Sequence, residues 1–294
     1  MKITVLGCGA LGQLWLHHLA AAGHQVQGWQ KQHTTPLRYC LTTLSGDTLQ
    51  AVCGSNDPQR LAESEILLVT LKSNQIASVL PDLLPVIAAN CAIILLHNGM
   101  GVSEYLPSVS QPLLQAITTQ AAMRQDGKVH HTANGITYIG ALNQAAKEHS
   151  WLADSLHDAL PEVLWHEQIT LAAWHKLAVN CAINPLSVYH HCRNGELLHH
   201  PDQLKALCDE VAQVMRSEGI DVSNDLLYLK VMTVIEQTSA NRCSMLQDVL
   251  ARRTTEIESI TGFLRQKAAL HGIATPENDK LYQFIKKKEQ HYVK

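Results

Sequence analysis

The spacing of hydrophobic and polar positions changes character at about residue 168. Before that point short apolar runs recur, and they resemble strands at residues 3–6, 25–29, 66–71, 92–96 and 114–119. Helix-like stretches such as residues 12–22 separate some of these runs, and this alternation predicts a parallel sheet with crossover helices. Residues 128–132 and 136–139 flank an Asn-Gly pair, which predicts that the sheet ends in a β-hairpin.

The pattern after about residue 168 has a period of 3.6 and contains no strand-like run, so we expect an all-helical second domain. Helices are predicted over residues 171–190, 201–217, 226–240 and 245–271, with a kink or an end at Pro185. The predicted domains are residues 1–167 and 168–294. A ligand site is expected in the cleft between two such domains.

The first predicted strand runs directly into a glycine-rich turn. Its six residues follow the G-x-G-x-x-G pattern: Gly7, Cys8, Gly9, Ala10, Leu11 and Gly12. Between a strand and an apolar helix, this pattern is typical of a dinucleotide-binding fold, because the glycines allow a tight turn and a close approach of the pyrophosphate. The helix N-terminus then offers free N–H groups to the phosphates.

The end of the second predicted strand indicates which dinucleotide is bound. Folds that bind NAD place an acidic residue there for the ribose 2′-hydroxyl, whereas the first acidic residue of this chain is Asp47. Lys31, with help from His33 or Arg38, can meet a 2′-phosphate, so NADP is favoured over NAD. The alternative is that Lys31 is a solvated loop residue. Lys72 and Asn98 follow later strands and are therefore further candidates for cofactor contacts.

Three polar residues align on one face of the predicted helix 171–190. Lys176, Asn180 and Asn184 are spaced at i, i+4 and i+8 in an otherwise apolar stretch. They either line a cleft or serve helix packing through a snorkelling lysine and backbone-bonded amides. In a cleft, a protonated lysine can stabilise an alkoxide and donate a proton to it, while amides bind hydroxyl and carboxylate groups. Asn194, in a predicted turn, brings another amide near this face.

Composition excludes several classes of protein. Lys and Arg total 23 against 26 for Asp and Glu and do not form a stripe, which argues against a nucleic-acid surface. The longest apolar stretch, residues 83–96, is shorter than a membrane span, and no signal peptide follows Met1. The eight cysteines lack a C-x-x-C pair, which indicates free thiols in a cytoplasmic protein. The paired histidines around Cys192 are interpreted as solvated, and no metal is expected.

Several motifs together resemble one known family, the ketopantoate reductases. The similar segments are GCGALG at 7–12, HNGMG at 97–101, ANGITYIG at 133–140, WHKLAVNCAINPL at 174–186, NGEL at 194–197, SMLQD at 244–248 and TEIE at 255–258. The resemblance spans almost the whole chain. It implies an N-terminal Rossmann domain, a helical domain similar to that of 6-phosphogluconate dehydrogenases, and NADPH-dependent reduction of 2-dehydropantoate to (R)-pantoate in pantothenate and coenzyme A biosynthesis.

The resemblance also assigns roles to individual residues. It places the general acid at Lys176 and a second catalytic residue at Glu256. Cofactor contacts fall on Gly7, Cys8, Gly9, Ala10, Leu11, Gly12, Lys31, Lys72, Asn98, Ala122 and Glu256. Substrate contacts fall on Asn98, Lys176, Asn180, Asn184, Asn194, Asn241 and Ser244. The family often has arginine where this chain has Lys31, and a lysine pairs with phosphate only as a point charge.

Two rival hypotheses stay open at this stage. A related 2-oxo acid, 3-hydroxy acid or opine-type dehydrogenase would share both predicted domains. A non-catalytic module that senses NADPH would bind the cofactor without turnover, and the Lys176 helix face argues against it. We expect a small-molecule substrate, no nucleic-acid or membrane partner, and a monomer or homodimer.

Overall fold

The computed structural model describes residues 1–31 and 35–291, and the chain divides into two compact units. The first unit comprises Met1–His97 and Tyr105–Ala172, and the second comprises Asn98–Glu104 and Ala173–Lys294. The short segment Asn98–Glu104 therefore belongs with the helical part of the chain, although it follows a strand of the first unit. The functional boundary at residues 167 and 168 stays a prediction.

The first unit contains an eleven-stranded sheet in the order β11-β10-β7-β6-β5-β1-β2-β4-β3-β9-β8. Its strands are β1 Lys2–Leu6, β2 Gln25–Trp29, β3 Leu37–Thr42, β4 Thr48–Ser55, β5 Ile66–Val69, β6 Ala92–Leu96, β7 Leu113–Thr118, β8 Ala121–Gln125, β9 Lys128–Ala133, β10 Thr137–Ala141 and β11 Val163–Trp165. Strands β2, β1, β5, β6 and β7 are mutually parallel. The predicted α/β Rossmann class is confirmed.

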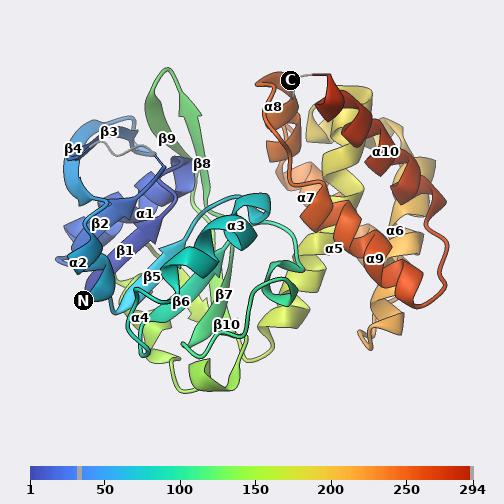
Figure 1. Ribbon diagram of the computed structural model, residues 1–294. Coiled ribbons are helices and arrows are strands. Elements are labelled where there is room, and N and C mark those ends of the chain that lie inside the picture. The colour runs from blue at the N-terminus through green and yellow to red at the C-terminus, as the bar shows by residue number, and fades with distance from the viewer. Residues whose placement is uncertain (32–34, 292–294) are drawn as a thin grey trace. The chain divides into compact units, whose positions relative to one another are not determined.

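The strand order reverses at β1, which lies between β2 and β5. In open α/β sheets, ligands bind beyond the carboxyl ends of the strands at such a reversal. Helix α1 packs on β1, β2 and the β8–β9 pair (Figure 1). The helices of this unit are α1 Ala10–Ala21, α2 Pro58–Ala62, α3 Ser73–Leu83 and α4 Trp151–His157.

The predicted hairpin around residues 134 and 135 is wrong. Strand β9 pairs antiparallel with β8 across a turn at Asp126 and Gly127, both with positive φ, and β10 pairs antiparallel with β7. Gly135 has another role, because a Cβ on it would lie 2.3 Å from the carbonyl carbon of Thr119. The glycine therefore permits a close approach of two backbones and does not form a hairpin turn.

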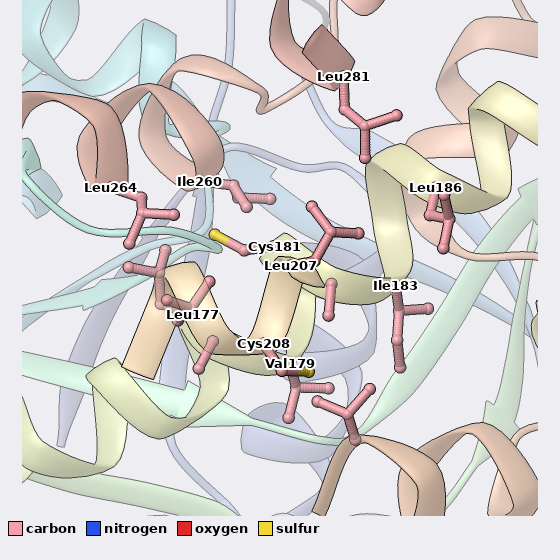
Figure 2. Close-up of a cluster of buried hydrophobic side chains, with 14 of the residues drawn as sticks. Leu177, Val179, Cys181, Ile183, Leu186, Leu207, Cys208, Ile260, Leu264 and Leu281 are labelled. Carbon is pink, nitrogen blue, oxygen red and sulfur yellow. The ribbon is translucent and has the colours of Figure 1, made fainter. Parts of the chain in front are cut away.

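The second unit is helical, as predicted. Its helices are α5 Ile169–His190, α6 Pro201–Ser217, α7 Asn224–Gln237, α8 Ser244–Leu250, α9 Phe263–Leu270 and α10 Pro276–Gln290. Figure 2 shows the buried side chains that join them, with Leu177 and Cys181 of α5 near Leu207 of α6 and Leu264 of α9. This apolar cluster fixes one face of α5 and leaves the opposite face for polar residues.

One prediction for this unit is corrected, and one of the two alternatives at Pro185 is excluded. The expected helix 245–271 is broken after Leu250, because Arg252 has a φ of +52° and the chain then runs without helical bonds to a π-helical turn, Glu258–Gly262. Pro185 does not end α5, which continues to His190. Helix α10 was not predicted, because nearly half of its residues are charged and its apolar face is narrow.

Candidate active site

The glycine loop after β1 is held against the ends of β2 and β5. The Gly7 N–H donates to the Trp29 carbonyl at 2.8 Å, and the Thr70 hydroxyl donates to the Gly7 carbonyl at 2.5 Å. A Cβ on Gly12 would lie 2.0 Å from the Gly7 oxygen, so α1 lies too close to the loop for any side chain there. The loop is therefore a tight turn that directs the start of α1 along the sheet edge.

The start of α1 fits a dinucleotide pyrophosphate. Gly9 precedes the helix, and a Cβ built on it would meet nothing within 4 Å, so this position opens onto free space. The first turn carries no acidic residue, which leaves the backbone N–H groups and the positive end of the helix dipole available to an anion. Ala10 and Leu11 can contribute only these main-chain groups.

Cys8 belongs to the motif but points into the protein. Its Sγ lies 3.9 Å from the Val5 carbonyl, and burial raises the pKa of the thiol to about 12. The buried Gln13 side chain donates to the Cys8 carbonyl at 2.9 Å and so fixes the orientation of this peptide. The contribution of Cys8 to a cofactor site is thus limited to its backbone.

The other cofactor candidates of the first unit lie on separate elements. Lys31 and Arg38 are exposed, Lys31 just after β2 and Arg38 within β3. His33 lies outside the described residues. Lys72 precedes α3 at the carboxyl end of β5, and Ala122 lies in β8 beside a register shift opposite β9.

Helix α5 presents the predicted polar face. Lys176 and Asn180 are partly exposed, whereas Asn184 is buried except for 7% of its surface. Their helical neighbours Leu177, Ala178 and Cys181 belong to the apolar cluster of Figure 2. The cluster therefore fixes the rotation of α5 about its axis, with Lys176 and Asn180 at the edge of the core and Asn184 within it.

Asn98 reaches this face because its segment packs on the π-helical turn. The Met100 N–H donates to the Ser259 carbonyl at 2.7 Å, and the Ser259 hydroxyl donates to the Asn98 carbonyl at 3.3 Å. A Cβ on Gly99, whose φ is +81°, would lie 2.3 Å from the Ser259 oxygen. Only glycine permits this contact, and π-helical turns are often found at functional sites.

Three predicted site residues meet in a single hydrogen-bonded group. Lys176 Nζ donates to Asn98 Oδ1 at 3.0 Å, and Asn98 Nδ2 donates to Glu256 Oε2 at 3.0 Å. The two partners fix the orientation of the Asn98 amide, because the ammonium requires an acceptor and the carboxylate a donor. We call Lys176, Asn98 and Glu256 the lysine group.

The surroundings of Lys176 shift the pKa of its ammonium. Burial lowers the pKa of Lys176 to about 8, and the negative charge of Glu256 partly opposes this shift. The residue before Glu256 is fixed as well, because the N–H and hydroxyl of Thr255 both donate to the buried Glu289 carboxylate at 2.7 Å. The site therefore holds a lysine that loses its proton more readily than an ordinary one.

The remaining predicted substrate contacts gather farther along α5. The Cys243 thiol contacts the Asn184 carbonyl at 3.6 Å and places the exposed Ser244, the first residue of α8, near that turn. The Asn194 N–H donates to the Asn241 carbonyl, and the Asn194 side chain donates to the Thr238 hydroxyl at 2.9 Å.

Lys176 and Asn184 are separated by eight residues, or about 12 Å of helix rise. The predicted site residues therefore form two clusters. The first consists of Asn98, Lys176 and Glu256. The second consists of Asn184, Asn194, Asn241 and Ser244.

The residues that support the glycine loop and the lysine group were not predicted. Gln13, Thr255 and Ser259 touch the backbone or the neighbours of site residues, and none stands out by residue type. The paired glycines at 99 and 101 are the one signal that the segment makes a close contact, because a Cβ on Gly101 would meet the Phe263 ring at 2.7 Å.

The described residues contain neither a candidate metal site nor a candidate membrane span. Within residues 1–31 and 35–291, no group of three or more His, Cys, Asp or Glu side chains could hold a metal ion. No helix in the same ranges is both long and apolar enough to cross a bilayer. The paired histidines pack on each other, with the rings of His190 and His200 stacked at 3.6 Å between centroids.

Comparison with known proteins matches both units. The family model described as "Ketopantoate reductase PanE/ApbA" matches residues 3–144, and that described as "Ketopantoate reductase PanE/ApbA C terminal" matches residues 168–289. The 2-dehydropantoate 2-reductase of Shigella flexneri is 48% identical over 99% of this chain and 96% of its own length. The protein of the same name from Vibrio cholerae is 40% identical over the full length of both chains.

Solved structures agree with this match. A PanE/ApbA family ketopantoate reductase from Ralstonia eutropha has a TM-score of 0.87 at 26% identity, with 99% of each chain covered. A D-mandelate dehydrogenase bound to NADH and anilino(oxo)acetate has a TM-score of 0.86 at 22% identity, over 99% of each chain. At that identity the second likeness concerns the fold alone.

Proposed function

Because the chain belongs to the ketopantoate reductase family, we propose that it catalyses the NADPH-dependent reduction of 2-dehydropantoate (ketopantoate) to (R)-pantoate. This reaction is a step of pantothenate and coenzyme A biosynthesis. The observation that carries the proposal is the lysine group, in which a partly buried ammonium is hydrogen-bonded through Asn98 to a carboxylate. A site that only bound a dinucleotide would have no use for such a proton donor.

Lys176 supplies the proton of the reaction. NADPH, when bound, supplies the hydride that adds to the carbonyl carbon of the keto acid. Negative charge then develops on the carbonyl oxygen, and the Lys176 ammonium first stabilises this charge and then donates its proton to form the hydroxyl. A pKa of about 8 leaves Lys176 mostly protonated at neutral pH and makes it a stronger acid than an ordinary lysine.

Glu256 and Asn98 keep Lys176 charged and oriented. The Glu256 carboxylate raises the pKa of Lys176 against the effect of burial, so the ammonium persists in an apolar helix. Asn98 Oδ1 accepts a hydrogen bond from the ammonium and so orients Nζ for proton transfer to the substrate. After proton transfer, the neutral amine regains its proton from water.

The amides along α5 bind the rest of the substrate. No hydrogen bond is found for the side-chain amides of Asn180 and Asn184 within the described residues, and both lie on the face of Lys176. Amides both donate and accept, which suits the carboxylate and the 4-hydroxyl of ketopantoate. Ser244 contributes its hydroxyl to the carboxylate region, and Asn194 and Asn241 support it from the second cluster.

The first unit selects NADPH over NADH. No acidic side chain lies in the described residues between β1 and β3, and Lys31 is exposed at the end of β2, where a ribose 2′-phosphate would lie. Lys72 and Ala122 complete the cofactor contacts. The enzyme acts on the small molecule ketopantoate, and it does so as a monomer or a homodimer.

The proposed reaction is tested by following NADPH absorbance after addition of ketopantoate. We expect NADPH oxidation that depends on both enzyme and keto acid, with (R)-pantoate as the product. 2-Oxo acids that lack the 4-hydroxyl serve as the comparison, and we expect a much lower kcat/KM for them. Equal kcat/KM for both substrates would make the chain a general 2-oxo acid reductase, and binding of NADPH without turnover would make it a cofactor sensor.

A further inference from the structure

The end of β4 anchors the chain on both sides of Lys31. Asn56 directly follows β4 and bonds to Gln30, the residue before Lys31. Ser55, the last residue of β4, accepts a hydrogen bond at its carbonyl from the Thr35 hydroxyl at 3.2 Å. Two consecutive residues of one strand end therefore fix Gln30 and Thr35, which lie on opposite sides of the lysine proposed to meet the 2′-phosphate.

The hydrogen bonds of Asn56 to Gln30 resemble those between neighbouring strands of a sheet. Asn56 Oδ1 accepts the Gln30 N–H at 2.8 Å, and Asn56 Nδ2 donates to the Gln30 carbonyl at 3.0 Å. The Asn56 N–H also donates to the Gly28 carbonyl at 3.0 Å. One asparagine therefore satisfies both main-chain groups of Gln30 and extends the alignment of β2 by one residue beyond Trp29.

The backbone of Asn56 is shaped for this contact. Its φ is +53°, a left-handed conformation that asparagine adopts more readily than most residues. On the other side of β2, the Trp29 carbonyl accepts the Gly7 N–H of the glycine loop. The end of β2 is thus held by the pyrophosphate loop on one side and by Asn56 on the other, which sets the position of Lys31 relative to a bound dinucleotide.

We propose that Asn56 is a positioning residue for cofactor selection, which places Lys31 where it can reach a 2′-phosphate by fixing both main-chain groups of Gln30. The inference rests on the part of the proposed function in which Lys31 selects NADPH. It concerns binding alone, so it is tested without keto acid, and a failure to reduce ketopantoate would leave it unaffected.

The test compares dissociation constants for NADPH and NADH, measured by titration calorimetry. Asn56→Gly removes the side chain and keeps the left-handed backbone accessible. We expect the preference for NADPH to fall by about threefold to tenfold, since misplacing one ammonium–phosphate contact weakens a single charge-assisted hydrogen bond. NADH affinity should hardly change, whereas a merely structural role would weaken both cofactors alike.

A double-variant cycle shows whether Asn56 acts through Lys31. Lys31→Ala alone should lower the preference more than Asn56→Gly does, and the double variant should lower it no further than Lys31→Ala. Thr35→Val, which removes the second anchor but keeps the side-chain shape, should lower the preference less than Asn56→Gly. It also provides a separate test if Asn56→Gly folds poorly.

Asn143 offers a matched control. Its side chain also binds main-chain groups, accepting the Leu113 N–H at 3.1 Å and donating to the Gln111 carbonyl at 2.8 Å, but it does so at the amino end of β7. Asn143→Ala should therefore leave the preference for NADPH unchanged.

The inference is overturned if Asn56→Gly leaves the preference unchanged, if it weakens both cofactors equally, or if its effect persists in full without Lys31. A wild-type protein that binds NADPH and NADH equally would overturn it together with the proposed selectivity.

Discussion

The glycine loop of the first unit and the lysine group of the second unit are built from different parts of the polypeptide. The loop offers main-chain N–H groups, and its side chains are absent, small or turned inward as in Cys8. The lysine group consists of three side chains separated by 78 and 158 residues in the sequence. A substitution therefore harms the loop by adding atoms and the lysine group by removing them.

This difference separates binding from chemistry. Main-chain groups at a helix N-terminus attract phosphate whatever reaction follows, so we expect the loop to determine cofactor affinity. In the proposed reaction the lysine group acts on charge that appears only in the transition state, so we expect it to determine the rate. The following predictions test this separation.

The largest effect is expected for Lys176→Ala. Loss of the general acid should lower kcat by roughly 10²–10⁴-fold, while the dissociation constant for NADPH stays close to that of the wild type. Steady-state kinetics and cofactor titration measure the two quantities. Lys205→Ala, on the exposed surface of α6, is the control and should change neither. Near-normal kcat in Lys176→Ala would remove this residue as the acid, and Glu256 would be tested next.

Gly9→Ala should weaken NADPH binding by at least about tenfold, because a methyl group would occupy the space into which the pyrophosphate moves. The melting temperature should hold, since nothing lies within 4 Å of the added Cβ. Gly12→Ala should differ from Gly9→Ala in its effect on stability. Its Cβ would meet the Gly7 oxygen at 2.0 Å, so we expect it to destabilise the fold by about 1–3 kcal/mol. Unaltered NADPH affinity in Gly9→Ala would contradict the placement of the pyrophosphate.

Gly99→Ala should disturb the lysine group without touching any of its side chains. The added Cβ would overlap the Ser259 carbonyl, and the positive φ adds strain of about 1 kcal/mol or more. We expect kcat to fall about tenfold as Asn98 moves, because small misplacements at a reacting centre are costly. Gly46→Ala, also at positive φ but in open space, controls for strain alone. Equal kinetic effects of the two variants would contradict the positioning role of Gly99.

Glu256→Gln should give the smallest effect, a shift in pH dependence. Burial lowers the pKa of Lys176 to about 8 and the Glu256 charge raises it, so removing that charge lowers it further. The proposed reaction requires the protonated lysine, so we expect activity to be lost as pH rises through this pKa. The alkaline limb of the kcat profile should therefore move to lower pH by about one unit, with little change near pH 6. Glu258→Gln, on an exposed side chain paired with Lys286, should leave the limb in place.

The same difference explains how much could be predicted from the sequence. The glycine loop is six consecutive residues after a strand, so its local pattern was sufficient. The alignment of Lys176, Asn180 and Asn184 also followed from helical spacing. Asn98 can join Lys176 and Glu256 because Gly99 packs on Ser259. This contact lies between segments that are distant in the sequence, so no local pattern predicts it.

The wrong predictions have a similar physical origin. The sequence predicts a hairpin turn at Gly135. In the structure a glycine is needed there because the backbone of Thr119, 16 residues earlier, leaves no room for a Cβ. The helix expected over 245–271 has suitable composition, yet the chain leaves it at Arg252 and re-enters through a π-helical turn beside Glu256. In both cases tertiary contacts overrode local propensity.

The separation of binding from chemistry is tested most directly by combining Gly9→Ala with Lys176→Ala. For each variant, NADPH affinity and the single-turnover rate of NADPH oxidation at saturating NADPH and ketopantoate are measured. We expect that Gly9→Ala changes only the affinity, that Lys176→Ala changes only the rate, and that the double variant shows both changes at full size. A Lys176→Ala enzyme that binds NADPH as weakly as Gly9→Ala, or a Gly9→Ala enzyme as slow at saturation as Lys176→Ala, would contradict it.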